Sequence, residues 1–381
     1  MTQNSGETHP SREAFPQTIW NPLLTLSSLG YLLTYAIPAI PILSTWLGEV
    51  TDHPNLFAFT SLAIAYPLVA FLQWLWPHPT PDQFDVAAIP KRSPLYFRLL
   101  LWGGVPAQLA MLAVTTDYWC SNSLNSWGRI GYLLSTGVMS GIFAITLGHE
   151  LIHRQQQPDQ FLGGLLLSTV SFGTFKVVHL QIHHCHVATP LDFATAQRGQ
   201  SLYSFWWQSI VGNSYGALRY EQERLAKVGK SFWQSELLIW YSFSLLWLSL
   251  TVWISGWLGG LFFILQSAIA ILKLDWTNYL QHYGLIRTVD ASGKYEPVSA
   301  QHAWSQALFL HDLALLNLFR HGEHHAAPNC PYPYLRSESR SPVYPYQHVT
   351  MFFLSLIPPV FQRVVHPCLE QFEAQQKEVL K

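Results

Sequence analysis

Long apolar stretches alternate with short polar connections along most of the chain. A helical span of a bilayer needs roughly 20 consecutive, mainly apolar residues, and six stretches satisfy this requirement. Their approximate ranges are 18–46, 54–76, 96–117, 127–147, 236–255 and 258–274. The pattern therefore predicts an all-α integral membrane protein with six transmembrane helices. An even number of spans places both termini on the same side of the membrane.

Basic residues are distributed unevenly between the two sides that these spans define. Arg129 is the only basic residue close to the three connections that contain no Lys or Arg, which are 47–53, 118–126 and 256–257. Cytoplasmic loops carry an excess of Lys and Arg. Both termini are therefore predicted to be cytoplasmic, together with the long segments 148–235 and 275–381, which are expected to form a histidine-rich helical cap.

Two further apolar segments, 161–178 and 349–365, lie within this cap. Each is short for a full span, and Pro358-Pro359 interrupts the second. They are predicted to be membrane-surface or bundle-packing helices. No internal repeat or linker divides the sequence, so residues 1–381 are expected to form a single membrane-bound domain.

Composition narrows the possible functions. The chain is 49% hydrophobic and only 11% charged, whereas about a quarter of the residues in a soluble domain are charged. Its formal net charge is -1 and it has no basic stripe, which argues against nucleic acid as a partner. The four cysteines form no C-x-x-C pair, so neither a disulfide framework nor a rubredoxin-type knuckle is indicated.

Histidine is the unusual residue type in this sequence. Eight of the 17 histidines stand singly and are interpreted as solvated or hydrogen-bonded side chains, including His186, which is left out of the site. The other nine fall into three clusters with i, i+3 or i+4 spacings and one further position. Such spacings place imidazoles on one helix face, where they can share a metal. The nine are His149, His153, His179, His183, His184, His282, His321, His324 and His325.

Neutral imidazole suits zinc, copper, iron and nickel, so ligand type alone does not select the metal. Nine histidines exceed one tetrahedral centre but fit two metals with open positions, which on iron implies dioxygen chemistry. Residues 149–153 also satisfy H-E-x-x-H, the zinc-protease signature. A zinc protease needs only one protein ligand beyond the two histidines of this motif, so it leaves most clustered histidines without a role. A metal transporter would need ligands inside the spans, whose centres lack charged residues.

The order of these motifs resembles that of a known enzyme family. His149-Glu150-Leu151-x-His153, His179-x-x-x-His183-His184, Asn278-Tyr279-x-x-His282-Tyr283-Gly284-Leu285 and Arg320-His321-x-x-His324-His325 together resemble the integral-membrane alkane 1-monooxygenases of the fatty-acid-desaturase-like superfamily. The resemblance covers about residues 148–367. The motif around His282 separates alkane hydroxylases and their xylene-monooxygenase relatives from ordinary desaturases.

The resemblance implies two non-haem irons held by the nine clustered histidines. It also implies insertion of one atom of O2 into a terminal methyl group, most simply of a medium-chain alkane. Electrons would come from rubredoxin or ferredoxin and its reductase, and the site would face the cytoplasm from the inner or plasma membrane. An acyl-lipid desaturase or hydroxylase and a xylene-type, aromatic-methyl monooxygenase are the open alternatives.

Four carboxylates near the motifs are candidates to accept the distal N–H of a ligand imidazole, which would fix its tautomer. They are Glu150, Asp192, Asp275 and Glu323, and Asn278 of the His282 motif is grouped with them. The chain departs from the family pattern at Val178 and Gln281, where family members usually carry Glu. Neither departure removes a ligand.

Overall fold

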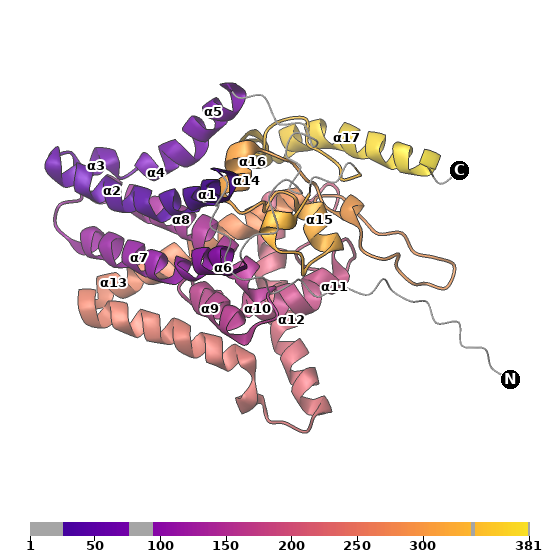
Figure 1. Cartoon of the computed structure of the whole chain (residues 1–381), viewed down its shortest axis with the longest axis horizontal. Helices are drawn as coiled ribbons and strands as arrows, with labels where there is room; N and C mark the ends of the chain where they lie inside the picture. Colours follow the sequence, from indigo (N-terminus) through magenta and orange to yellow (C-terminus); the bar gives the residue numbers. More distant parts are fainter. Residues whose placement is uncertain (1–25, 76–93, 337–339, 380–381) are drawn as a thin grey trace.

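The computed structural model describes residues 26–75, 94–336 and 340–379, and within these ranges the regular structure is helical apart from one isolated bridge between Val289 and Tyr295 (Figure 1). Residues 18–25 of the first predicted span and Trp76 of the second lie outside these ranges. Four helical segments are long and apolar enough to cross a membrane: Ser28–Val50, Leu95–Cys120, Ser126–Ile152 and Glu236–His282. Together they mark an integral membrane protein.

The helix α13 (Glu236–His282) contains both of the last two predicted spans. It bends at Gly256, whose φ of 66° and ψ of -167° lie in a region that L side chains rarely adopt. A Cβ on Gly260 would lie 2.6 Å from Val252 Cγ2, so the two arms pack closely beside the bend. The helix continues beyond Leu274, the predicted end of the sixth span, to His282, and its last turns are buried against other parts of the chain.

The region of the second predicted span is not one continuous helix. A helix α3 (Pro54–Phe57) precedes a 16-residue apolar helix at Thr60–Leu75, which comprises α4 (Thr60–Ala63), a π-helical turn η2 (Ile64–Leu68) and α5 (Val69–Leu75). Pro67 lies inside the π-helical turn. Since proline lacks a backbone N–H and clashes with the preceding turn, the regular hydrogen-bond ladder cannot continue through it.

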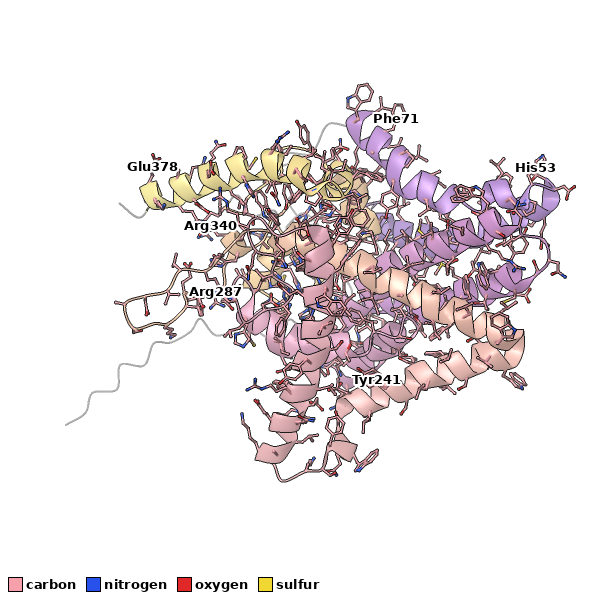
Figure 2. The ribbon with its side chains drawn as sticks, turned by 180° about the vertical axis from the view of Figure 1, so that it is seen from behind. His53, Phe71, Tyr241, Arg287, Arg340 and Glu378 are labelled. Carbon is pink, nitrogen blue, oxygen red and sulfur yellow. The ribbon has the colours of Figure 1, made fainter. Side chains whose placement is uncertain are left out.

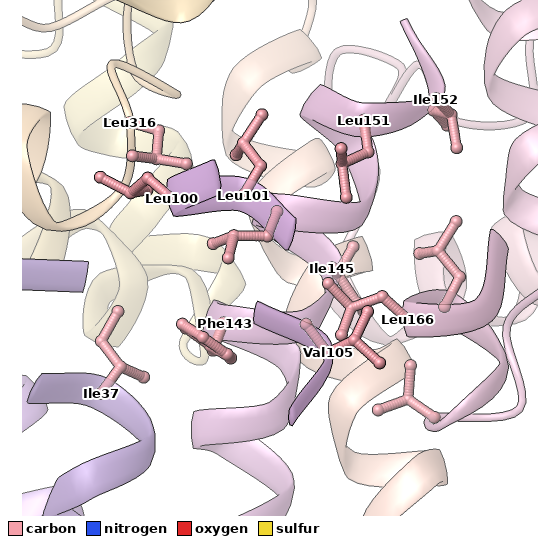
Figure 3. Packing of buried hydrophobic residues seen from close by; sticks show 14 of the residues in the cluster. Ile37, Leu100, Leu101, Val105, Phe143, Ile145, Leu151, Ile152, Leu166 and Leu316 are labelled. Atoms are coloured by element: carbon pink, nitrogen blue, oxygen red, sulfur yellow. The ribbon is translucent and has the colours of Figure 1, made fainter. Parts of the chain in front are cut away.

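The helix α8 (Ser126–Ile152) lies at the centre of the bundle. It packs against α13, α9 (Gln157–Ser168), α7 (Gly104–Cys120) and α2 (Ala36–Val50). Glycines let the helices approach: a Cβ on Gly137 would lie 2.6 Å from Ile269 Cβ, and one on Gly141 would lie 2.8 Å from the Ala270 carbonyl oxygen. Phe143, Leu151 and neighbouring core side chains fill the space around α8 (Figure 3).

The remaining helices range from single turns to the long helices α12 (Leu202–Lys227) and α17 (Pro358–Val379), and most of them follow α8 or α13 in the chain. They comprise α1 (Leu26–Gly30), η1 (Tyr31–Tyr35), α6 (Pro94–Trp102), α10 (Thr174–Val178), η5 (His179–His183), α11 (His184–His186), α12 (Leu202–Lys227), η6 (Phe232–Gln234), η7 (Ala300–His302), α14 (Phe309–Ala314), α15 (His321–Ala326), η8 (Tyr332–Tyr334), α16 (His348–Ser355) and α17 (Pro358–Val379). The apolar segment 161–178 forms α9 and α10, and Pro358 begins α17.

The two ends of the bundle differ in what they carry. The bend of α13 and the short helix α3 lie at one end, whereas α11 and α15 lie toward the other (Figure 1). Arg287, Arg340 and Glu378 also lie away from His53, which marks the α3 end (Figure 2). The histidine-bearing elements and many charged side chains therefore lie at the opposite end from the short connections.

Candidate metal centre

Four parts of the fold carry the nine clustered histidines to one place. The last turn of α8 carries His149, His153 follows as the C-cap of that helix, and α13 ends at His282. A π-helical turn, η5, continues into α11, and α15 supplies the final three histidines. All nine side chains are buried or half-buried.

The π-helical turn explains the spacing of the middle cluster. In an α-helix, residues five apart point about 140° away from each other, since each residue turns the chain by about 100°. The wider π turn brings such residues closer to one face. His179 Nε2 and His184 Nε2 are accordingly 3.0 Å apart, while His183 between them contacts a different group of rings.

The nine histidines form two groups rather than one. Within each group the ring nitrogens lie within 4.8 Å of one another. The five-histidine group consists of His149, His153, His179, His184 and His324, and the four-histidine group consists of His183, His282, His321 and His325. Rings of the two groups touch, with centroids of His184 and His325 only 4.6 Å apart. The arrangement offers two adjacent metal positions.

Separations between ring nitrogens fit metal ligands. With metal–nitrogen bonds of about 2.1 Å, ligands at right angles are about 3.0 Å apart and tetrahedral ligands about 3.4 Å apart. Nε2 of His149 and His324 are 3.1 Å apart, and Nε2 of His282 and His321 are 3.0 Å apart. The spacing favours centres with more than four coordination positions.

The protonation state and the hydrogen bonds of the clustered histidines also fit metal ligands. Burial, and then the neighbouring imidazoles, lower the pKa of His321, His324 and His325 well below the usual histidine value, so these rings stay neutral as ligands must. His183 Nε2 is buried and has no hydrogen-bond partner among the described residues. Such an orphaned nitrogen is costly unless a metal occupies its lone pair. The residues present fit two bound metal ions.

Comparison with known proteins agrees with this geometry. Residues 125–355, more than half of the chain, match the fatty acid desaturase family. The chain is 35% identical to alkane 1-monooxygenase 2 of Alcanivorax borkumensis over 94% of this chain and 95% of that protein. The chain belongs to the alkane 1-monooxygenase family.

Other members and relatives share most of their length with this alkane 1-monooxygenase-like oxidoreductase. Alkane 1-monooxygenase 2 of Pseudomonas aeruginosa is 35% identical over 92% of this chain and 94% of that protein. The xylene/toluene monooxygenase hydroxylase component of Pseudomonas putida is 32% identical over 64% of this chain and 65% of that protein. The sequence similarity therefore extends well beyond the histidine motifs.

One predicted carboxylate contacts a clustered histidine of this alkane 1-monooxygenase-like oxidoreductase. Asp192 Oδ2 lies 2.9 Å from His183 Nδ1 and also accepts a hydrogen bond from Thr195 Oγ1 at 2.6 Å. Burial raises the pKa of Asp192, but His183 and the hydrogen bonds outweigh it, so the pKa lies below its usual value. The carboxylate holds His183 with Nε2 directed to the four-histidine group.

The hydrogen bonds of two other carboxylates differ from those predicted. Glu150 Oε1 accepts from Arg154 Nη2 at 2.6 Å and from the Tyr332 backbone N–H at 3.1 Å. Asp275 Oδ1 accepts from Ser209 Oγ at 2.8 Å. Both acids thus stabilise contacts between separate parts of the chain, and their predicted contact with a ligand imidazole stays a prediction.

Three further positions considered in the sequence analysis make no described hydrogen bond to a clustered histidine or stay untested. Asn278 hydrogen-bonds to Asp275 and not to a histidine. Glu323 is half-buried on α15, and its role at the site stays a prediction. His186 is half-buried outside both histidine groups.

A buried ion pair behind α15 was missed by the sequence analysis. Nε and Nη2 of Arg320 donate to Asp312 Oδ2 at 3.1 and 2.8 Å, and Nη1 donates to the Leu335 carbonyl at 2.8 Å. The pair anchors the residue immediately before His321. Asp312 lies in α14 and Arg320 eight positions later, beyond the end of that helix, so no helical spacing marked them as neighbours.

Two pockets reach the histidines. One of about 260 Å³ opens to solvent beside His153 and His184, with Arg154, Gln181 and Asn329 at its rim. The other is a narrow cavity of about 10 Å³, with room for about one water molecule. It is lined by Thr146, His149, Glu150, Leu315, Leu316, Leu318, His324 and Leu335. The five-histidine group therefore borders both a solvent-facing pocket and a small internal cavity.

Asp192→Asn is expected to weaken metal retention by about 10–100-fold, because the neutral amide orients and polarises the His183 ring less well. The measurement is iron remaining per chain after timed dialysis against a chelator. Asp290→Asn, which changes an exposed acid in a loop, is the control. Equal retention by Asp192→Asn and the unaltered protein would show that this hydrogen bond does not tune the site.

Proposed function

We propose that this protein is a di-iron monooxygenase of the membrane that inserts one oxygen atom from O2 into a terminal methyl C–H of an apolar hydrocarbon. The observation that carries the proposal is the division of nine buried histidines into adjacent groups of five and four. Two imidazole-bound irons with open positions would supply dioxygen activation there. The monooxygenase names of the relatives support the same reaction class.

The protein's own residues exclude water and direct the substrate. Leu315, Leu316 and Leu318 form an apolar wall opposite His149 and His324 in the narrow cavity. The cavity has room for about one water molecule and is too small for an alkyl chain. A substrate methyl group can therefore enter only if these leucine side chains move aside. The apolar wall would then hold the methyl against the five-histidine group and keep bulk water from the reacting carbon.

The zinc-protease alternative assigns Glu150 the role of general base. That role requires a carboxylate free to take a proton from a metal-bound water. Arg154 and the Tyr332 backbone both bind Oε1 of Glu150, so these contacts leave Oε2 for that role and do not separate the two alternatives. The histidine grouping does separate them, because His149 and His153 share their group with three further histidines and a protease site needs only one further ligand. This grouping favours the oxygenase.

The proposed arrangement in the membrane has six spans, with the two arms of α13 and the helix at Thr60–Leu75 crossing in addition to the other three long helices. Both termini and the histidine groups would then face the cytoplasm, within one domain formed by residues 1–381. Electrons would reach the site from a rubredoxin- or ferredoxin-type carrier and its reductase. A carrier bound over the pocket beside His153 and His184 would approach the centre at its solvent-facing side.

Turnover of n-decane under ¹⁸O2 tests the reaction. The iron-loaded protein in lipid, supplied with rubredoxin, its reductase and NADH, is expected to form 1-decanol that carries one ¹⁸O atom. Formation of an alkene would favour a desaturase. Unlabelled alcohol, or no product from decane and from toluene alike, would contradict the proposal.

A further inference from the structure

The helix α12 exposes apolar side chains although it lies outside the long apolar helices. Five of these side chains follow one another at helical spacings, and we call them the α12 stripe: Tyr203, Trp207, Ile210, Val211 and Leu218. Trp207 is 74% exposed. A contiguous apolar patch on the outside of a protein marks an interaction surface, because contact with water is unfavourable for it.

The exposed surface of α12 has an apolar side and a polar side. Since each residue turns a helix by about 100°, the residues of the α12 stripe all point to one side. The exposed polar residues point to the side next to it, and they include Ser204, Arg219, Gln222 and Glu223. A third side is buried against the rest of the chain through Phe205 and Ser209. This helix is therefore amphipathic even among the side chains that the fold leaves exposed.

Both ends of α12 are attached to α13 where the apolar arms of that helix begin and end. Near the start of α12, Trp206 Nε1 donates to the Leu272 carbonyl oxygen at 3.1 Å. Near its end, Glu221 Oε2 accepts a hydrogen bond from Ser235 Oγ at 2.8 Å and one from the Glu236 backbone N–H at 3.0 Å. The first arm of α13 begins at Glu236, and the apolar part of the second arm ends close to Leu272.

These attachments set the direction of α12 relative to the membrane. Because α13 turns back at Gly256, the start of its first arm and the end of its second arm lie on the same side of the membrane. A helix attached to both points has to run along that surface. The helix α12 accordingly crosses the direction of the α13 arms (Figure 1; from behind in Figure 2). Its 26 residues extend about 39 Å.

The connection from α12 to α13 combines an exposed tryptophan with two lysines. Trp233 in η6 is 85% exposed and lies only three residues before α13 begins. Lys227 and Lys230 are exposed, and neither forms an ion pair within the described part of the chain. Tryptophan and lysine next to the start of an apolar helix are typical of the interface between membrane and water. The connection therefore belongs at the level of the lipid headgroups.

A phospholipid layer satisfies all of these groups together. Its acyl chains can cover the α12 stripe, and its phosphate groups can pair with Lys227 and Lys230. The same layer covers the first arm of α13, where Leu245 and Leu246 are exposed. The stripe thus continues a surface that already faces lipid. A protein partner would instead need an apolar groove and acidic residues at the same level beside the membrane.

The helix α12 also supports the π-helical turn that carries histidines of both groups. Tyr220 OH donates to Gln181 Oε1 at 2.9 Å. A Cβ on Gly216 would lie 3.2 Å from Ile182 Cδ1, so the two elements pack closely. Both contacted residues belong to η5. The position of α12 at the membrane surface therefore sets the depth of the histidine groups below it.

We propose that α12 is an interfacial helix whose stripe lies among the acyl chains of the leaflet on the histidine side, with Lys227 and Lys230 at the phosphate groups of that leaflet. The partner is the phospholipid layer itself. Contact with lipid holds η5 and its histidines at a fixed distance from the membrane surface. This role does not depend on the reaction proposed above.

Photo-crosslinking of the full chain tests this contact. The photoreactive residue p-benzoylphenylalanine replaces Trp207, where one exposed aromatic ring takes the place of another. The protein is irradiated in nanodiscs of equal amounts of phosphatidylcholine and phosphatidylglycerol, and adducts are identified by mass spectrometry. Phospholipid adducts are expected to be about tenfold or more abundant than with the probe at Gln222, which is exposed on the polar side of α12. A probe at Leu246 is the positive control.

Equal phospholipid adducts from the probes at Trp207 and Gln222 would overturn the inference. Adducts at Trp207 that join it to a second copy of the chain would also overturn it, as would lipid adducts at Leu246 alone. A probe at Trp233 tests the lysines. Phosphatidylglycerol should be enriched about twofold or more among its adducts, and the double variant Lys227→Gln/Lys230→Gln should abolish this enrichment. Enrichment that persists in the double variant would overturn the assignment of the two lysines.

Discussion

His282→Ala is expected to lower iron content from about two ions per chain to one or fewer and to reduce hydroxylation by more than about 100-fold. Removal of a residue that only orients a ligand costs 10–100-fold, and loss of a ligand should cost more. His282 lies on a different helix from its neighbours in the four-histidine group and is fully buried, with Nε2 3.0 Å from His321 Nε2. No nearby side chain can replace it.

The control for His282→Ala is His186→Ala, which removes a half-buried imidazole outside both histidine groups. Iron per chain by mass spectrometry and product per unit protein are measured on both variants. His186→Ala should retain both. Full iron and normal turnover in His282→Ala would remove this residue from the site.

Asp312→Ala is expected to lower the free energy of unfolding by about 3–5 kcal/mol, because it leaves the guanidinium of Arg320 buried and unpaired. Arg320 is 5% exposed and donates two hydrogen bonds to this carboxylate. Since the next residue is His321, the loss of the pair should also loosen α15. Urea titration in detergent, followed by tryptophan fluorescence, measures the change.

Glu223→Ala provides the comparison for this ion pair. It breaks a pair with Arg219 in which both side chains are more than half exposed, and such pairs contribute about 0–1 kcal/mol. The double variant Asp312→Leu/Arg320→Met should recover much of the lost stability, since no charge is then left buried. A loss in Asp312→Ala no larger than that in Glu223→Ala would show that the buried pair does not hold α15.

Periodicity along the sequence predicted the all-helical, membrane-embedded character of the chain, because long apolar runs leave few alternatives. It could not predict where a helix passes beyond the apolar run. The turns of α13 after Leu274 carry several polar residues, yet they remain helical because neighbouring parts of the chain bury Asn278, Gln281 and His282. Only tertiary contacts supply that information.

The histidine motifs predicted which residues come together in the fold, but not how these residues are divided between the two groups. Neighbours in sequence, His183 and His184, belong to different groups. The π-helical turn that separates them is a local deviation from the α-helix that no spacing rule signals. The contacts of Glu150 with Tyr332 and of Asp275 with Ser209 were likewise hidden, because these partners are far apart in sequence.

Lys273 shows a different limit of reasoning from the sequence. At the end of an apolar run it is typical of a lysine that extends to the membrane surface. Its position over the Phe352 ring becomes visible only when α13 and α16 are packed together. The same packing gives His348 an unsatisfied nitrogen that the sequence cannot reveal.

Metal content of the detergent-purified full chain is the most direct measurement of the central claim that nine histidines form two iron sites. Inductively coupled plasma mass spectrometry on protein produced with iron and zinc both available is expected to give close to two irons per chain. One zinc and no iron, after a check that metals do not exchange during purification, would contradict the claim and make the protease interpretation the better one.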